Sequence, residues 1–532
     1  MHTQVIIVGA GPVGLTLAID LGRRGIRCIL LEQKEAPQFL PKMERCNART
    51  MEIYRRIGIA QKIRDAGFPR DVPMDVFIIT SLIEPPLLRL PYPSVAEAQA
   101  DIAAHNDGTR PLEPYQLISQ YTLEPLLKSV AEGIPAIDVR YGHEFLSFEQ
   151  DAGGVRAKVK QPDGSTAEFS AEYLVGCDGG TSNVRRQLGI KLQGEANLLQ
   201  LRQALYRCDD LFERIPIGKG RHYHVADDKA TFLIVQDSTR HFTLHAVVDS
   251  DEEMKTQFEK TVAMPVKYEM LSCAPWRQNL LVADYYGQGR VFLAGDAVHL
   301  VIPTGGLGMN SGVGDAVDLS WKLAATLQGW GGPNLLASYE IERRQIGVRN
   351  VEASRQASRG RRAWRSMWRP EINDNTPEGE AARAALVRVA DVEQRKSNEM
   401  IGAELGYRYR GSPIIAEEPG EGPPDNFMAY EPTTRPGARL PHVWLEDGAA
   451  IQDAIPDGYV LLRLGRSQAD AEPLQRAFAT YGAPLSVLDI AGDRPREIYG
   501  YDLLLLRPDM HVVWRDNALR EPAPLARLAT GH

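Results

Sequence analysis

The chain has 532 residues, more than one hydrophobic core usually serves, so two or three domains are expected. Its 43% hydrophobic and 24% charged residues are typical of a globular protein, and its net charge of −8 argues against a nucleic-acid partner. Five widely spaced cysteines without a C-x-x-C pair favour a reducing compartment and offer neither a disulfide framework nor a zinc site. No apolar run reaches the roughly eighteen residues of a membrane helix, so a cytoplasmic protein without a membrane partner is expected.

A glycine-rich turn follows the first apolar strand. The apolar run Val5 to Val8 leads into Gly9, Gly11 and Gly14 in G-x-G-x-x-G spacing, and helical periodicity resumes from Leu15 to Leu21. In a dinucleotide-binding βαβ unit these glycines make the turn, admit a pyrophosphate and let the helix pack on the strand. The pattern predicts a diphosphate at the helix N-terminus, where free N–H groups and the helix dipole favour an anion.

A second apolar strand ends in an acid. Residues 28–31 lead to Glu32, about twenty residues beyond the glycines, where a carboxylate can accept hydrogen bonds from the hydroxyls of an adenosine ribose. Strand, glycines, helix, strand and acid in this order favour a dinucleotide over a glycine turn without a ligand.

The next segments mix helical and extended patterns. Helical periodicity runs from Asn47 to Ile57, and the basic residues Lys42, Arg45 and Arg49 could face either an anionic ligand or water. The polar stretch from Val95 to Thr109 predicts a loop or lid.

An Asp-Gly turn ends a later buried strand. Asp178 and Gly179 follow the run up to Val175, and a basic helix start with Arg185 comes after them. Such a turn can face ligand phosphates, although an Asp-Gly pair by itself is usually only a turn.

The middle of the chain predicts a separate sheet. From about Gln200 to Trp276 short β-like runs indicate antiparallel strands, with His222 and His224 on one face. No carboxylate or cysteine completes a metal-ligand pattern around them, so no metal is expected. Each histidine is more simply explained as an ordinary sheet residue than as a catalytic one.

A second glycine-rich stretch follows this sheet. A core strand delivers Asp296 to its C-terminal end, and the glycine-rich residues 303–312 lead to a helix expected over Val313 to Leu327. So many glycines indicate that the backbone closely approaches a ligand. The two glycine turns together suggest one extended ligand, with phosphates at the first helix and a group that becomes anionic at the second.

These motifs resemble those of the class A flavoprotein monooxygenases, the single-component FAD-dependent aromatic hydroxylases. The resemblance rests on Gly9 to Gly14 with Glu32, on Asp178 with Arg185, and on Gly295 and Asp296 with the glycine loop after them. Residues 436–442 and 506–515 look like the thioredoxin-like C-terminal domain of the phenol hydroxylase branch.

The resemblance implies an α/β fold with a Rossmann-like FAD-binding domain interleaved with a β-sheet substrate domain. The FAD-binding domain would comprise residues 1–75, 101–180 and 280–400, and the substrate domain residues 76–100 and 181–279. A linker over 401–435 would lead to the thioredoxin-like domain at 436–532. Members of this branch are often dimers, so a homodimer is implied.

The resemblance also implies resident FAD and a transient NADPH or NADH. Glu32 would hold the ribose, Asp296 the ribityl chain, and Gly308 to Asn310 the flavin pyrimidine edge. Asp178 and Arg185 would serve both FAD and the nicotinamide cofactor, and Lys42 stands where arginine is commoner in the family. The implied cofactor-binding residues are Gly9, Gly11, Pro12, Val13, Gly14, Glu32, Gln33, Lys42, Arg45, Gln120, Asp178, Arg185, Gly295, Asp296, Pro303, Gly306, Gly308, Met309 and Asn310.

The implied reaction is hydroxylation of a phenolic or other aromatic substrate by O2 through a flavin C4a-hydroperoxide. His222 or His224 would be the base that deprotonates the phenol, and Pro303 would border the reacting edge of the flavin. Baeyer–Villiger insertion or epoxidation of a polycyclic substrate is the main alternative, because fold does not fix function. A flavin-binding protein without catalysis is the second. A halogenase is disfavoured because the chain has no W-x-W-x-I-P stretch.

Overall fold

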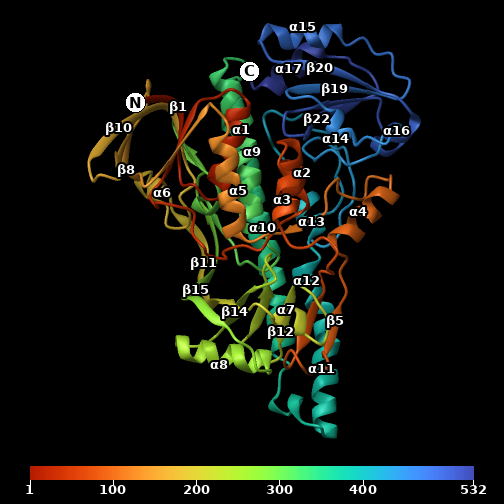
Figure 1. The fold of residues 1–532 in the computed structure, drawn as a ribbon. Coiled ribbons are helices and arrows are strands. Elements are labelled where there is room, and N and C mark those ends of the chain that lie inside the picture. Colours follow the sequence, from red (N-terminus) through yellow and green to blue (C-terminus); the bar gives the residue numbers. More distant parts are fainter.

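The computed structural model describes residues 1–532 as two eight-stranded sheets, helices that pack along them and a smaller C-terminal sheet (Figure 1). The first sheet has the strand order β16-β17-β10-β1-β2-β7, and a hairpin of β8 and β9 continues from β10. Its strands are β1 (His2–Val8), β2 (Cys28–Glu32), β7 (Ile137–Tyr141), β8 (Glu144–Asp151), β9 (Gly154–Lys160), β10 (Thr166–Gly176), β16 (Gly287–Gln288) and β17 (Val291–Leu293).

The parallel register of the first sheet brings its glycine-rich turns to one edge. Val8 of β1 pairs with Gly176 of β10, which pairs with Leu293 of β17. Val8 also lies opposite Leu31, the residue before Glu32. Because parallel strands end at the same edge of a sheet, the segments that follow all four strands lie together there.

Three helices pack side by side against this sheet: α1 (Pro12–Arg23), α5 (Gln120–Glu132) and α9 (Gly308–Leu327). The apolar residues of β1 are completely buried except for a small part of Val8, as expected for a parallel strand with both faces covered. The shorter elements near this sheet are β3 (Arg45–Cys46), β6 (Gln116–Leu117), α2 (Ala48–Arg56), α3 (Ala60–Ala66), α6 (Asn183–Gln187) and the 3-10 helix Gly295–Ala297. Helix α4 (Val95–Ala104) lies beside the C-terminal domain, where Trp444 Nε1 donates to the Ile102 carbonyl (Figure 1).

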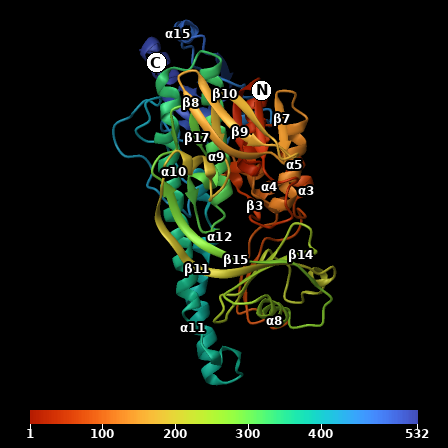
Figure 2. The ribbon, with the colours of Figure 1, turned by 90° about the vertical axis from the view of Figure 1, so that its left-hand side faces the viewer.

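The second sheet is antiparallel, as expected, except that β4 runs parallel to β12. Its strands, in spatial order, are β18 (His299–Leu300), β15 (Glu269–Ala283), β11 (Leu192–Arg207), β14 (His241–Ala246), β13 (Phe232–Val235), β12 (His222–Val225), β4 (Val76–Ile79) and β5 (Leu88–Leu90). The long strands β11 and β15 curve from the level of the first sheet down to the second (Figure 2).

The two faces of the second sheet have different partners. Tyr223, Leu233 and Leu244 belong to a buried core that includes residues of α7 (Leu211–Arg214) and α8 (Asp251–Val262). His222 and Phe232 lie on the opposite face. His222 points toward Glu44, just before β3, and Phe232 points toward Arg361 in the helix after Pro333.

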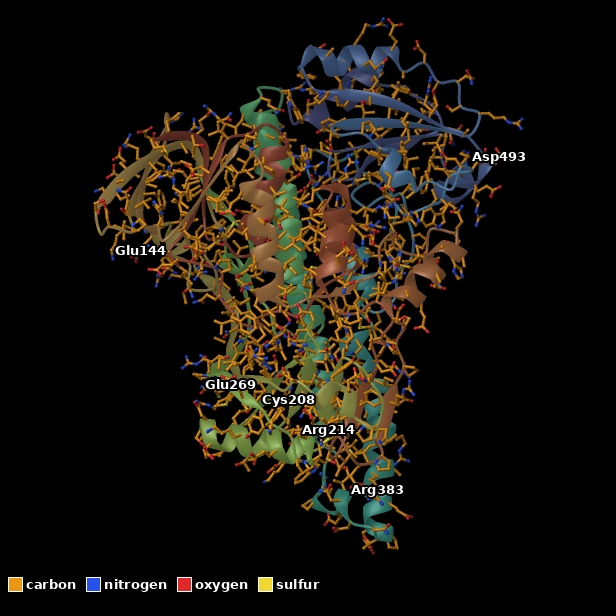
Figure 3. The ribbon with its side chains drawn as sticks, viewed as in Figure 1. Glu144, Cys208, Arg214, Glu269, Arg383 and Asp493 are labelled. Atoms are coloured by element: carbon orange, nitrogen blue, oxygen red, sulfur yellow. The ribbon has the colours of Figure 1, made fainter.

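One long helix accompanies both sheets. The helix α10 (Pro333–Arg365) has 33 residues and runs from the first sheet to the second, where α11 (Pro377–Glu393) packs on it (Figures 1 and 2). The remaining elements of this segment are the 3-10 helix Pro370–Asn373, α12 (Arg395–Asn398) and α13 (Ile401–Leu405). Arg383 of α11 lies at the opposite end of the molecule from Asp493 of the C-terminal domain (Figure 3).

Two expectations about helices were wrong. Residues from Val95 onward form helix α4 and not a loop, because Ser94 and Glu97 make a reciprocal capping box. Helix α9 begins at Gly308 and not at Val313. Its glycines lower intrinsic helix propensity, but Gly312 packs against Val13 and Gly314 against Arg343, where a larger residue would clash.

The C-terminal domain has a four-stranded sheet of order β20-β19-β21-β22, in which only β19 and β20 are parallel. Its elements are α14 (Ile451–Ala454), β19 (Tyr459–Leu464), α15 (Glu472–Thr480), β20 (Leu485–Ile490), α16 (Asp493–Tyr499), β21 (Leu503–Leu506), β22 (Val512–Asp516) and α17 (Pro522–Thr530). No helix of the molecule is both long and apolar enough to cross a membrane.

Buried ion pairs join the C-terminal domain to the rest of the protein. Arg507 donates to Glu342 of α10 and to Asp318 of α9, each at 2.7 Å, and all three side chains are buried. Arg439 donates from Nε to Glu52 of α2 at 2.6 Å. A cavity of about 40 Å³ lies at this contact, away from the glycine turns. The segment expected as a linker, 401–435, starts with α13, and its Tyr409 is buried against Arg343.

The Arg439–Glu52 pair allows a test of this docking. Replacement of Arg439 by Met leaves the buried Glu52 carboxylate with Arg49, at 3.4 Å, as its one cationic partner. Breaking a buried ion pair in this way costs up to about 3–5 kcal/mol of unfolding free energy. We expect a loss of this size in urea unfolding and a partial recovery in the double variant Glu52→Gln/Arg439→Met. Arg476→Ala removes an exposed ion pair with Glu472 and serves as the control, for which we expect a change within about 0.5 kcal/mol. An Arg439→Met protein as stable as this control would contradict the docking role.

Candidate flavin and substrate site

The first glycine turn leaves room for a ligand at one position only. Gly9 has φ +104°, and a Cβ there would overlap the Cys177 carbonyl, while a Cβ at Gly14 would overlap the Gly9 carbonyl. A Cβ at Gly11 would have Oε1 of Glu124 as its nearest neighbour, at 3.9 Å. Gly9 and Gly14 are therefore needed for packing, whereas Gly11 borders open space.

The N-terminus of α1 has unpaired hydrogen-bond donors. Gly11 is the N-cap, no side chain caps the helix, and no acidic residue occupies its first turn. Pro12 has no N–H group, and the N–H groups of Gly11, Val13 and Gly14 meet no acceptor of the protein. These donors at the positive end of the helix dipole can bind an anionic group.

Glu32 is fixed beside this turn. Its Oε2 accepts the Ala10 N–H at 3.0 Å, and its Oε1 accepts the Lys34 N–H, also at 3.0 Å. Each oxygen keeps a further lone pair, so the carboxylate can still accept hydrogen bonds from ribose hydroxyls. Gln33, the next residue, is exposed.

The second glycine turn is supported from below by a buried carboxylate. Asp315 accepts the Gly295 N–H at 3.0 Å, His299 Nε2 lies 2.8 Å from it, and Arg343 Nε donates to it at 2.8 Å. Burial alone would raise the pKa of Asp315, but His299 and Arg343 more than offset this effect and lower it. The ionised carboxylate fixes the position of the turn that carries Asp296.

Asp296 lines a recess. Its side chain is accessible to solvent, yet the surrounding protein raises the pKa of its carboxyl by burial, against the opposing effects of His299 and Lys42. A group that is both accessible and densely surrounded lies in a concavity, where a ligand hydroxyl can reach it. Lys42 is exposed and close enough to Asp296 to act on its charge.

The N-terminus of α9 repeats the arrangement of α1. Gly305 and Gly306 have positive φ values of +92° and +67° in a turn closed by a hydrogen bond from Gly306 N–H to the Pro303 carbonyl. The N–H groups of the first helical turn, at Gly308, Met309 and Asn310, meet no acceptor of the protein. These are the residues that the sequence analysis assigned to the pyrimidine edge, and they belong to the helix and not to the loop before it.

Side chains from β3 and α9 hold this second turn in place. The Asn310 side chain accepts the Asn47 N–H at 2.9 Å and donates to the Arg45 and Gly306 carbonyls. Arg45 is buried beneath Gly306 and donates to the Gly305 carbonyl. Both side chains are therefore engaged in shaping the loop.

The two turns belong to one recess, because Val13 of α1 packs against both Gly295 and Gly312. Two sets of unpaired N–H groups, the Glu32 carboxylate and the accessible Asp296 carboxyl occupy the edge where β1, β2 and β17 end. This set fits FAD, which has a diphosphate, a ribose, a ribityl chain and a pyrimidine edge that becomes negative on reduction.

The other residues proposed to bind the cofactor have partners within the protein. Asp178 caps α6 by accepting the Asn183 and Val184 N–H groups at 2.7 and 3.1 Å. Arg185 donates to the Ala297 carbonyl at 2.9 Å and so braces the Asp296 turn. Gln120 donates to Glu124 at 2.6 Å beside Gly11.

The two histidines of the second sheet differ in their surroundings. His222 is 3% exposed, its Nε2 lies 2.7 Å from Glu44 Oε2, and its Nδ1 has no partner. Burial lowers its pKa to about 4, so the imidazole is neutral near pH 7. His224 is 0% exposed, stacks on Phe232, and has Arg365 and Gln394 beside its two ring nitrogens.

Glu44 is a residue that sequence reasoning missed. It is partly accessible, and its pKa is lowered to about 2 because the nearby His222, Arg221 and Arg45 outweigh the effect of burial. Its neighbour Arg45 bonds the Gly305 carbonyl, so the His222–Glu44 pair lies next to the second glycine turn. The sequence gives no signal for this pair, because 178 positions separate its members.

The two kinds of glycine at the first turn can be separated by substitution. Gly11 has φ −72° and open space around its Cα, so Gly11→Ala should fold normally while its methyl group blocks the approach of the diphosphate. We expect FAD affinity to fall about 10- to 100-fold with no loss of thermal stability. Gly14→Ala should instead lower stability as well, because its methyl group overlaps the Gly9 carbonyl. Flavin absorbance per mole of protein and thermal unfolding measure the two effects, and normal FAD affinity in Gly11→Ala would contradict this assignment.

Comparisons with known proteins agree with this geometry. Residues 2–354 match the family described as FAD binding domain, and residues 433–530 match the family described as aromatic-ring hydroxylase, C-terminal. The chain is 32% identical to the FAD-dependent monooxygenase apdD of Emericella nidulans, over 98% of this chain and 89% of that protein. The structure of chromopyrrolic acid-soaked RebC with bound 7-carboxy-K252c is similar, with a TM-score of 0.91 and 33% identity over 100% of this chain and 99% of that one.

A ternary complex of aklavinone-11 hydroxylase with FAD and aklavinone has a TM-score of 0.84 and 27% identity, over 100% of this chain and 99% of that one. Sequence, fold and the geometry of the two glycine turns thus lead to the same assignment. The chain belongs to the FAD-binding-domain family with an aromatic-ring hydroxylase C-terminal domain, and it is an FAD-dependent aromatic monooxygenase.

Proposed function

We propose that the protein uses NADPH or NADH and O2 to hydroxylate a phenolic or other aromatic substrate, which binds between the second sheet and the second glycine turn. The observation that supports this most is the position of the His222–Glu44 pair. Contacts run from His222 to Glu44, to its neighbour Arg45 and then to the Gly305 carbonyl, which links the sheet face directly to the flavin-binding turn.

FAD, when bound, accepts reducing equivalents from the nicotinamide cofactor and activates O2 for transfer of one oxygen atom. The protein positions it. The donors of Gly11 to Gly14 hold the diphosphate, Glu32 the ribose and Asp296 the ribityl chain. The free N–H groups of Gly308 to Asn310 stabilise negative charge at the pyrimidine edge by roughly 1–2 kcal/mol.

The His222–Glu44 pair removes the proton from the substrate hydroxyl. Neutral His222 donates its Nε2 hydrogen to Glu44, which leaves Nδ1 as a lone pair without a partner. The Nδ1 lone pair accepts the proton of the substrate hydroxyl, and the ionised Glu44 carboxylate stabilises the imidazolium that forms. Removal of this proton makes the ring a stronger nucleophile toward the transferred oxygen.

His224 and Pro303 have supporting parts in this proposal. Arg365 and Gln394 lie beside the two ring nitrogens of His224 and fix its ring. The ring stacks on Phe232, with 4.2 Å between the ring centres, and so positions it. Pro303 is exposed at the start of the second glycine turn and borders the reacting edge.

We also propose a cytoplasmic homodimer. Its five free cysteines fit a reducing compartment. Light scattering of the holoprotein measures the assembly state, and a monomer at micromolar concentration would exclude the dimer.

The reaction can be tested with purified holoprotein. We expect a yellow protein with one FAD per chain, whose NAD(P)H consumption rises when phenols or hydroxylated aromatic acids are added. The product should gain one oxygen atom from O2 with the ring system intact by NMR. A lactone or an epoxide would instead support Baeyer–Villiger insertion or epoxidation, and NAD(P)H consumption that no aromatic compound stimulates would support a flavin-binding protein without catalysis.

His222 should control the chemical step. We expect His222→Gln to lower kcat about 10²- to 10³-fold with unchanged FAD content, because the substrate proton then lacks its acceptor. In the wild type, His222 must be neutral to accept a proton, so kcat should stay flat from pH 8 to 6. It should fall toward the His222 pKa of about 4. The exposed His105 provides the control variant His105→Gln. A His222→Gln enzyme with normal kcat would rule out this role.

A further inference from the structure

We propose that the aromatic substrate carries an ionised carboxylate, which Arg361 and Arg221 bind at the end of the recess remote from the flavin-binding turn. The inference rests on the proposed function, whose site it extends. It adds a substrate class and two residues that recognise it.

Two arginines beside the second sheet have no anionic partner. Arg221 is 2% exposed, and its Nε and Nη1 atoms have no hydrogen-bond acceptor. Arg361 of α10 is half-buried, its Nε also has no acceptor, and its guanidinium lies 4.8 Å from the centre of the Phe232 ring. Burial of a cation without an acceptor is costly, so a missing partner is indicated.

Three other buried arginines of the protein have a carboxylate partner. Arg343 bonds Asp315, Arg439 bonds Glu52, and Arg507 bonds Glu342. Glu44, whose charge acts on both Arg221 and Arg361, is already bonded to His222. Burial and the neighbouring Arg365 lower the pKa of Arg361 to about 9, which still leaves it charged near pH 7. The recess therefore holds an excess of positive charge that an anionic ligand group would neutralise.

The aromatic side chains of the sheet face next to Arg361, which form one wall of the proposed site, can stack on a planar aromatic substrate. Phe232 pairs with His245 across the sheet, and the His245 ring stacks on Trp276 with an interplanar angle of 11°. Gln203, which lies opposite His245, bonds the Pro41 carbonyl and so links this wall to the segment that carries Lys42. Aromatic rings stack on such a surface, while the planar guanidinium fork of arginine matches a carboxylate.

Positions along helix α10 give the distance between the second glycine turn and Arg361, which the substrate must span. Ala353 belongs to the same small buried cluster as Leu307 of the second glycine turn, and Arg361 follows eight residues later on the same helix. At 1.5 Å per residue, this separation is about 12 Å along the helix axis. A substrate that reacts near the turn and reaches Arg361 is longer than a single ring, so a fused aromatic acid is the fitting class.

Binding to the holoprotein tests the inference. The probes are 4,5-dihydroxyanthraquinone-2-carboxylic acid and the same compound with a methyl group in place of the carboxyl. We expect the acid to perturb the flavin absorbance with a Kd about 10- to 100-fold lower than that of the methyl compound. Arg361→Gln should abolish this preference, whereas Arg361→Lys, which keeps the charge but loses the fork, should retain part of it.

Arg362→Gln is the matched control, because Arg362 follows Arg361 on the same helix and is exposed. We expect it to bind like the wild type. The thermal stability of Arg361→Gln should be unchanged or higher, since an unpaired cation is removed, and a purely structural arginine would show the opposite. The KM for NAD(P)H should not change, which separates a substrate carboxylate from a nicotinamide phosphate.

An acid that binds no tighter than its methyl analogue, including the case in which neither binds, would overturn the inference. So would equal weakening in Arg361→Gln and Arg362→Gln, or a selective rise in the KM for NAD(P)H. These outcomes leave the proposed function in place. That function fails separately if the protein binds no FAD or if no aromatic compound stimulates NAD(P)H consumption.

Discussion

The structure depends on two helix N-termini that direct unpaired N–H groups into the same recess. An α-helix leaves its first N–H groups without intrahelical acceptors, and here neither α1 nor α9 uses a side chain to cap them. The parallel register of β1, β10 and β17 places both helix starts at one edge of the sheet. The close packing of Val13 on Gly295 and Gly312 fixes their spacing.

The support for this recess extends far from it. Asp315 holds the Gly295 turn and is itself held by Arg343 of α10, the neighbour of Glu342. Glu342 in turn bonds Lys322 and Arg507, so the C-terminal domain is joined to the helices behind the flavin site through buried charges. Buried pairs of this kind contribute little net stability but penalise any other arrangement, which makes them suited to fixing one geometry.

The sequence predicted the parts of the site that are local in the chain. Gly9 to Gly14 and Gly295 to Asn310 each place strand end, turn and helix start within a few residues, so their roles follow from spacing. Glu44, Arg221 and Arg361 come from three distant segments and meet only through packing of the second sheet on α10, which no local pattern reports. Helix α4 is a different case, because its Ser94–Glu97 capping box was visible in the sequence.

The buried charges between the domains have a consequence for how the chain could be shortened. Within the helices, Asp318 and Glu342 share one cation, Lys322, and Arg507 of the C-terminal domain bonds both acids as well as its own Asp509. Loss of that domain would remove the Arg507 guanidinium from both acids and from the face of the Trp321 ring. A chain shortened before this domain would therefore keep one of these two acids neutral, and burial already raises the pKa of Asp318 to about 7. The buried acids of α9 and α10 therefore depend on a residue of the C-terminal domain, which lies outside both helices.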